Sequence, residues 1–155
     1  MKRLALLAIA GVVLAGCGGS SRLSKSAYEE KLQTDGKSVQ KSVTALTKTT
    51  PATLADLAKR VDAAEASVKQ AADDLDSIKP PSDAVADNTA IVAELRTLQS
   101  GLERLKKAAS AGDPAAAQKI AGQLSSSPQL KAAEKATADL KKKGYKVGVI
   151  GAPAS

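Results

Sequence analysis

Two long stretches in the middle of the chain place apolar residues at alternating intervals of three and four, and this spacing constrains the fold more than any other feature. In the first stretch the apolar positions are Leu54, Leu57, Val61, Ala64, Val68, Ala71, Leu75 and Ile78. In the second they are Ala84, Ile91, Leu95, Leu98, Leu102, Leu105 and Ala109, and the polar residue Asn88 occupies one position of the same spacing. This spacing keeps one side chain per turn on a single helix face, so it predicts two helices packed lengthwise at a shallow angle.

Proline residues mark the ends of these two helices. Thr50-Pro51 is typical of a cap followed by the first helical residue, and Pro80-Pro81 is a stop, so the first helix of the pair is predicted over about 51–78 and the second over about 82–111. Asn88 is the polar residue in the second stripe. It either fixes the register between helices or points at water, and the sequence leaves both open.

The flanking segments are also predicted to be helical. Ser26-Ala27-Tyr28-Glu29 matches a capping box, and the apolar stripe that follows consists of Tyr28, Leu32, Val39, Val43 and Leu46. Gly112-Asp113-Pro114 begins a further helix, which Ser127-Pro128 interrupts and which Gly144 ends as a left-handed cap. Short loops between these segments predict an all-α, up-down bundle of about four helices over 26–144, the last one interrupted. A three-helix array that dimerises through its long stripes is the alternative.

The start of the chain has the layout of a secretory signal peptide. Lys2 and Arg3 precede an apolar run from Leu4 to Leu14, and small residues follow. The run is too short to span a bilayer, which takes about 20 apolar residues. We therefore expect residues 1–16 to be removed on export.

Leu14-Ala15-Gly16-Cys17 resembles the bacterial lipobox. The resemblance implies cleavage between Gly16 and Cys17 and attachment of a diacylglyceryl group to the Cys17 thiol, on the extracytoplasmic face of a bacterial membrane. The other interpretation, a buried or free thiol in an ordinary signal peptide, suits poorly a cysteine followed by Gly and Ser. Residues 17–25 would then form the lipidated cysteine and a flexible tether, and residues 145–155 a C-terminal tail.

The composition argues against catalysis. The chain has no His and its one Cys is assigned to lipid, which removes the usual general base, nucleophile and metal ligands. We expect no enzyme activity, no metal and no cofactor. The cluster Asp73, Asp74 and Asp76 lacks the glycine turn of a calcium loop, so we expect a solvated or salt-bridged face rather than a calcium site. Two tyrosines are the only aromatic residues, which argues against a nucleic-acid partner.

The formal net charge of +7 is unevenly distributed. An up-down bundle brings together at one end the residues Arg22, Lys25, Lys141, Lys142, Lys143 and Lys146. We expect this cluster to face the membrane, near anionic lipid headgroups or acidic envelope polymers. Two competing explanations are pairing with the aspartates at 73–76 and compensation of a helix dipole by Lys141 to Lys143.

The mature part resembles the small helical lipoproteins, rich in alanine and lysine, of bacterial cell surfaces. The expected function is a membrane-anchored, non-enzymatic interaction or structural module of the cell envelope, with an unidentified protein partner. The alternative is a small-ligand binding accessory protein of a transporter.

Overall fold

A computed structural model describes residues 21–48, 50–125 and 128–148. The elements are α1 (Lys25–Thr47), α2 (Leu54–Ser77), the 3₁₀ turn η1 (Ser82–Ala84), α3 (Val85–Ser110), α4 (Pro114–Ser125) and α5 (Pro128–Lys142). No strand occurs within the described ranges, so the predicted all-α fold is confirmed. The signal-peptide and lipobox predictions fall on residues 1–20, outside the described residues.

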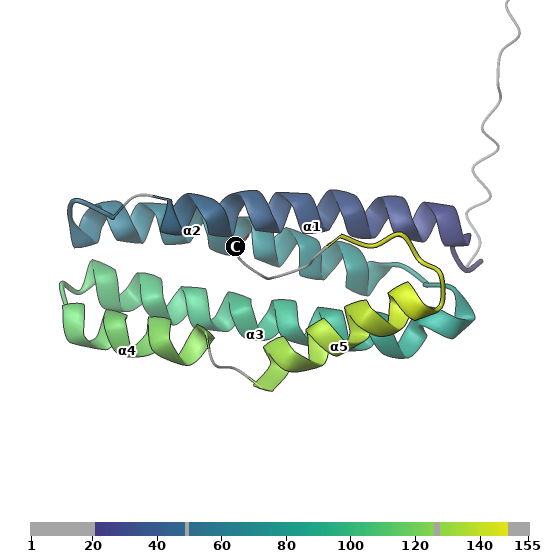
Figure 1. The fold of residues 1–155 in the computed structure, drawn as a ribbon. Coiled ribbons are helices and arrows are strands. Elements are labelled where there is room, and N and C mark those ends of the chain that lie inside the picture. The colour runs from purple at the N-terminus through teal and green to yellow at the C-terminus, as the bar shows by residue number, and fades with distance from the viewer. Residues whose placement is uncertain (1–20, 49, 126–127, 149–155) are drawn as a thin grey trace, which may run out of the picture.

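The helices form two layers that run up and down the long axis (Figure 1). α1 and α2 make one antiparallel layer; α3 makes the other with α4 and α5, which both pack on α3. The interrupted fourth helix is thereby confirmed. We call the end that holds the start of α1, the α2–α3 turn and the end of α5 the basic end, and the opposite end the distal end.

Two helices begin at other residues than predicted. Ser24, not Ser26, caps α1, because its side chain accepts a hydrogen bond from the Ala27 N–H at 3.2 Å. Thr53, not Thr50, caps α2 through the Asp56 N–H at 3.0 Å. In both cases the cap is the hydroxyl residue whose extended backbone brings its oxygen to the N–H three positions on. The predicted caps at Asp113 and Gly144 are confirmed: Asp113 Oδ1 accepts from the Ala116 N–H at 2.9 Å, and Gly144 has a φ of 78°.

The two long stripes meet in the core, as their spacing predicts. Val61, Val68, Leu75, Ile91 and Leu95 are all nearly or completely buried. Small alanines in the same stripes let the helices approach closely, so a core without Phe or Trp still fills its space.

Asn88 is a structural link between three helices. Its side chain is buried, its Oδ1 accepts from the Tyr28 hydroxyl of α1 at 3.1 Å, and its Nδ2 donates to the Leu75 carbonyl of α2 at 3.1 Å. Of the two interpretations of this residue, the register role is the one that the geometry favours, because these bonds exist at one alignment of the helices.

Both predicted boundaries of the bundle need correction. Tyr145 and Val147 are buried in the core, so residues 145–148 belong to the fold rather than to a tail. At the other end the Leu23 N–H donates to the Lys79 carbonyl at 2.8 Å and Arg22 donates to the Pro80 carbonyl at 3.0 Å. The predicted tether of residues 17–25 therefore packs on the α2–α3 turn from Arg22 onward.

Candidate functional site

The fold brings the six predicted basic residues to one end but engages most of them internally. Arg22 bonds to Pro80 as above, and Lys25 Nζ donates to the Lys143 carbonyl at 2.9 Å while lying 4.5 Å from the centre of the Tyr145 ring. The backbone N–H of Lys146 donates to Glu29 Oε1 at 3.0 Å.

The three consecutive lysines differ in what they contact. Lys143 Nζ lies 2.6 Å from Asp87 Oδ2 and 2.6 Å from the Asp83 carbonyl, so it secures the end of α5 to α3. Lys142 contacts Asp139 at 3.3 Å, and both Lys141 and Lys142 are exposed. Of these three lysines, Lys143 therefore has a structural contact, whereas Lys141 and Lys142 face solvent.

The aspartates at 73–76 are not the partners of these lysines. Asp73 pairs with Lys69 and Arg96, Asp74 with Lys31, and Asp76 with Arg96. Hydrogen bonds from Lys69 and Arg96 lower the pKa of Asp73 below its ordinary value. Of the two predicted alternatives, a solvated or a salt-bridged face, the structure shows the salt-bridged one. Within the described residues, no group of three or more acidic or Cys side chains is placed to hold a metal ion.

The two tyrosines, distant in sequence, meet near the basic end. Their rings lie edge to face, with centroids 5.9 Å apart and planes at 90°. The Tyr145 hydroxyl donates to Asp83 Oδ1 at 2.7 Å, and burial together with this bond raises the pKa of Tyr145 to about 12. These contacts close the bundle between α1 and α5 at this end.

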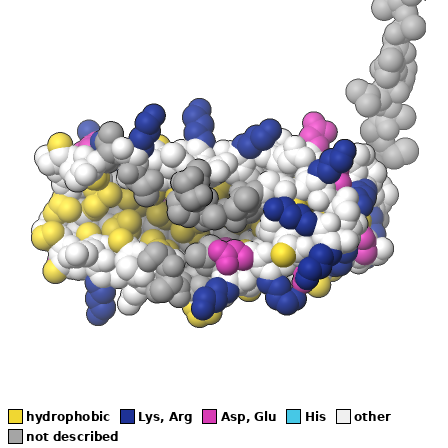
Figure 2. Space-filling view, in the orientation of Figure 1, with side chains coloured by type: hydrophobic (Ala, Val, Ile, Leu, Met, Phe, Trp, Pro, Cys, Tyr) yellow, Lys and Arg dark blue, Asp and Glu magenta, His cyan; other side chains and the backbone are white. Residues whose placement is uncertain are grey.

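Among the described residues, the two layers are not closed in this way in the distal half of the bundle. α1 packs against α2, and α4 packs against α3, but α1 and α4 share no comparable packing. Figure 2 shows hydrophobic side chains at the surface between the two layers there. Six half-buried apolar residues of this half make up what we call the distal apolar strip: Val43, Leu46, Leu57, Leu98, Ile120 and Leu124.

The sequence did not single out this strip. Val43, Leu46, Leu57 and Leu98 were predicted as core because they continue the stripes that are buried elsewhere. Whether such a residue is covered depends on the neighbouring helix. The only sequence signal is the interruption at Ser127-Pro128, which leaves α4 with 12 residues.

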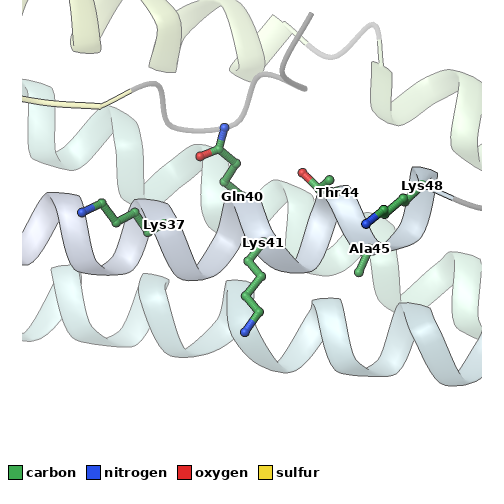
Figure 3. A pocket seen from close by; sticks show the side chains of 6 residues that line it. All are labelled: Lys37, Gln40, Lys41, Thr44, Ala45 and Lys48. Atoms are coloured by element: carbon green, nitrogen blue, oxygen red, sulfur yellow. The ribbon is translucent and has the colours of Figure 1, made fainter.

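The outer surface of α1 beside the strip is basic. A shallow depression of about 420 Å³ is lined by Lys37, Gln40, Lys41, Thr44, Ala45 and Lys48. Gln40 and Thr44 project together on one side of the helix, and Lys41 projects on the opposite side (Figure 3). The described residues that line it all belong to α1 and its C-terminal cap, and these alone do not make the concave site that a small ligand needs.

Comparison with known proteins adds no relative: no protein-family model, curated protein or solved structure matches the chain. None of the described helices combines the length and the apolar character that crossing a membrane requires.

Proposed function

We propose that this chain is a lipid-anchored, extracytoplasmic lipoprotein of the bacterial envelope, a non-enzymatic module that holds a helical bundle at the membrane and binds a protein partner through its distal apolar strip. The observation that carries the proposal is the position of the strip, at the opposite end of the bundle from Arg22, which follows Cys17 by five residues in the sequence. α1 has 23 residues and is about 35 Å long. An anchor at one end thus leaves the strip well away from the bilayer.

The short segment between Cys17 and Arg22 would keep the basic end of the bundle close to the membrane. Arg22 already packs on the α2–α3 turn, so only the residues from Gly18 to Ser21 lie between it and Cys17. Fully extended, the five-residue step from Cys17 to Arg22 covers at most about 18 Å. Two acyl chains on Cys17 would hold the bundle stably, since each buried methylene contributes about 0.8 kcal/mol.

A surface partner accounts for the strip better than a small ligand does. A small-molecule carrier needs a concave site that covers most of its ligand, and the depressions on the described surface are shallow. A strip of partly exposed Leu, Ile and Val side chains between two helices instead fits a partner's apolar side chains.

The anchor is tested by Cys17→Ser. Because the thiol is the proposed acyl acceptor, the variant should lose incorporation of radioactive fatty acid and leave the membrane fraction. Equal labelling of variant and parent would end the lipoprotein assignment.

The strip is tested by photocross-linking in cells. A benzophenone side chain at Ile120, in the strip, should give one discrete protein adduct, and the same group at the exposed Ala66 of α2 should give none. Absence of an adduct at Ile120, or the same adducts at both positions, would contradict the proposed role of the strip.

A further inference from the structure

Helical geometry orders the side chains around the distal half of α1. The hydroxyl oxygens of Ser42 and Ser67 lie 2.7 Å apart, so Ser42 marks the flank of α1 that faces α2. Because an α-helix has about 3.6 residues per turn, the strip residue Val43 comes next around the helix, followed by Gln40 and Thr44. The strip therefore has a border of neutral polar side chains on the flank of α1 away from α2.

A row of lysines lies beyond this border. Lys37, Lys41 and Lys48 are separated by four and seven residues, which places them on one face of α1 and its C-cap. All three are exposed, and none of them forms an ion pair within the described residues. The sequence from 36 to 48 contains no Asp or Glu. We call Lys37, Lys41 and Lys48 the lysine row.

The carboxylates of the distal half are engaged elsewhere. Those that form ion pairs do so with cations of α2 and α3: Asp56 with Arg60, Asp62 and Glu65 with Lys106, and Glu103 with Lys107. Asp113 caps α4. α4 itself has no Asp or Glu, and its one charged residue is the exposed Lys119. Both helices that border the strip therefore carry lysines without a paired carboxylate among the described residues.

The length of the strip matches a short helix. α4 forms one of its walls, has 12 residues and is about 18 Å long. α1 and α4 run along the same long axis of the molecule (Figure 1). A groove between two such helices suits an amphipathic helix whose apolar side chains recur at positions i, i+3, i+4 and i+7. A helix of about three turns would cover the same length as α4.

We propose that the partner binds the distal apolar strip through an acidic amphipathic helix of about three turns, with its apolar side chains in the strip and its carboxylates facing the lysine row. This proposal rests on the proposed function, because it specifies the partner of the same surface. A second copy of the chain would bring lysines against lysines, since both bordering helices are basic. A polyanion without apolar groups would pair with the lysines but leave the strip uncovered.

Three synthetic peptides of about 12 residues test the proposal with the mature chain from Gly18. The first has Leu at positions i, i+3, i+4 and i+7 and Glu at most of the others. The second has Lys in place of each Glu, and the third has the composition of the first with its Leu residues scattered around the helix. In fluorescence anisotropy, the first should have a dissociation constant at least tenfold lower than either of the others.

Each of the other outcomes would overturn the proposal. Equal affinity for the first and second peptides would mean that the surface does not recognise acidic charge. Equal affinity for the first and third would mean that it binds any polyanion. Absence of binding by the first peptide would mean that the strip does not accept such a helix.

Charge reversal tests where the peptide binds. Lys37→Glu with Lys48→Glu should weaken binding of the first peptide at least tenfold, because two cations of the lysine row become anions. Lys59→Glu with Lys131→Glu makes the same change of charge at exposed positions of α2 and α5, and it should weaken binding less than threefold. Thermal melts confirm that each variant is folded. Equal weakening by the two double variants would show that only the net charge of the chain attracts the peptide, which would overturn the proposal.

The cross-linker at Ile120 separates this proposal from the proposed function. If the first peptide binds as expected and Ile120 gives no adduct in cells, the surface accepts acidic helices and the proposed function is wrong. If Ile120 gives an adduct with another protein and the first peptide does not bind, the strip has a partner and the acidic helix is wrong. An adduct between two copies of the chain would make the strip a dimer interface and would also overturn the acidic helix.

Discussion

At the scale of single residues, one glycine determines how α4 sits on α3. A Cβ built on Gly101 would collide with the Leu124 side chain, whereas a Cβ on Gly122 meets no atom within 4 Å. Gly101 is therefore a position of close helix approach, and Gly122 is an ordinary helix position where glycine weakens the helix.

These two glycines give a matched pair of substitutions. Gly101→Ala should lower the free energy of unfolding by about 1–3 kcal/mol, because Leu124 must move. Gly122→Ala should raise it by up to about 1 kcal/mol, because alanine favours the helix. Urea denaturation followed by circular dichroism measures both. Stabilisation by both substitutions would mean that α4 does not seat Leu124 against Gly101.

A second residue-scale feature is the carboxyl group of Glu94, buried between α3 and α5. Its Oε2 has no hydrogen-bond partner among the described residues, and burial, with a smaller contribution from Glu134, raises the pKa of Glu94 from 4.5 to about 7. Because the folded state resists ionisation, this group's contribution to stability is greatest below pH 4.5 and is lost as the pH rises through about 7.

Glu94→Gln tests this pH dependence by removing the titration. At pH 8 the variant should be more stable than the parent by about 1–3 kcal/mol, and the difference should shrink toward zero near pH 4.5. Denaturant midpoints measured across this range provide the comparison, with Glu134→Gln on the exposed partner as the control. Equal stabilities of parent and Glu94→Gln at pH 8 would show that the carboxyl group reaches water.

At the scale of elements, the stripe of α2 stabilises the bundle along its length. Val68 lies in the middle of that stripe and is 0% exposed. Val68→Asp places an unpaired charge among apolar side chains and should cost several kcal/mol. Ala66→Asp, on the exposed face of the same helix, should change stability by less than about 1 kcal/mol. Thermal melts followed by circular dichroism distinguish them, and a parent-like melt for Val68→Asp would mean that this face is open.

At the scale of the whole molecule, the two ends carry different surfaces, and the basic end is proposed to face the membrane. The mature chain from Gly18 should bind anionic vesicles weakly and release them at high salt. Lys141→Gln with Lys142→Gln should reduce this binding by up to about 30-fold, since each lysine contributes about 1 kcal/mol at most. The melting temperature should fall only slightly, because both side chains are exposed, although they lie in the last turn of α5 and Lys142 contacts Asp139.

Two control variants test the proposed orientation. One shows whether vesicle binding depends on the position of the lysines or only on their total charge, and the other shows the effect of a lysine that stabilises the fold. Lys37→Gln with Lys41→Gln removes the same charge beyond a Debye length of about 8 Å from the basic end, so vesicle binding should hardly change. Lys143→Gln should lower the melting temperature, because it leaves the buried carboxylate of Asp87 without its cation. Equal loss of vesicle binding from the two double variants would refute the orientation.

The helices, their order and most of the core followed from the sequence. Apolar spacing is a local property, and it placed Val61, Val68 and Leu75 of α2 and Ile91 and Leu95 of α3 in the core. Helix starts were less certain, because Thr50 and Thr53 are both capable caps. The choice depends on which one has extended backbone at the right distance, and that is set by the turn between α1 and α2.

What only the tertiary structure decided is which partner each residue meets. The sequence left Asn88 between two roles and placed residue 145 onward in a tail, whereas packing brings Tyr28 against both Asn88 and Tyr145, 60 and 117 residues away. It likewise joins Lys143 to Asp87 rather than to the aspartates at 73–76, and leaves part of a continuous apolar stripe half-exposed at the distal end. Periodicity determines which face of a helix is apolar; whether that face is covered depends on a neighbour distant in the chain, and no local pattern encodes that neighbour.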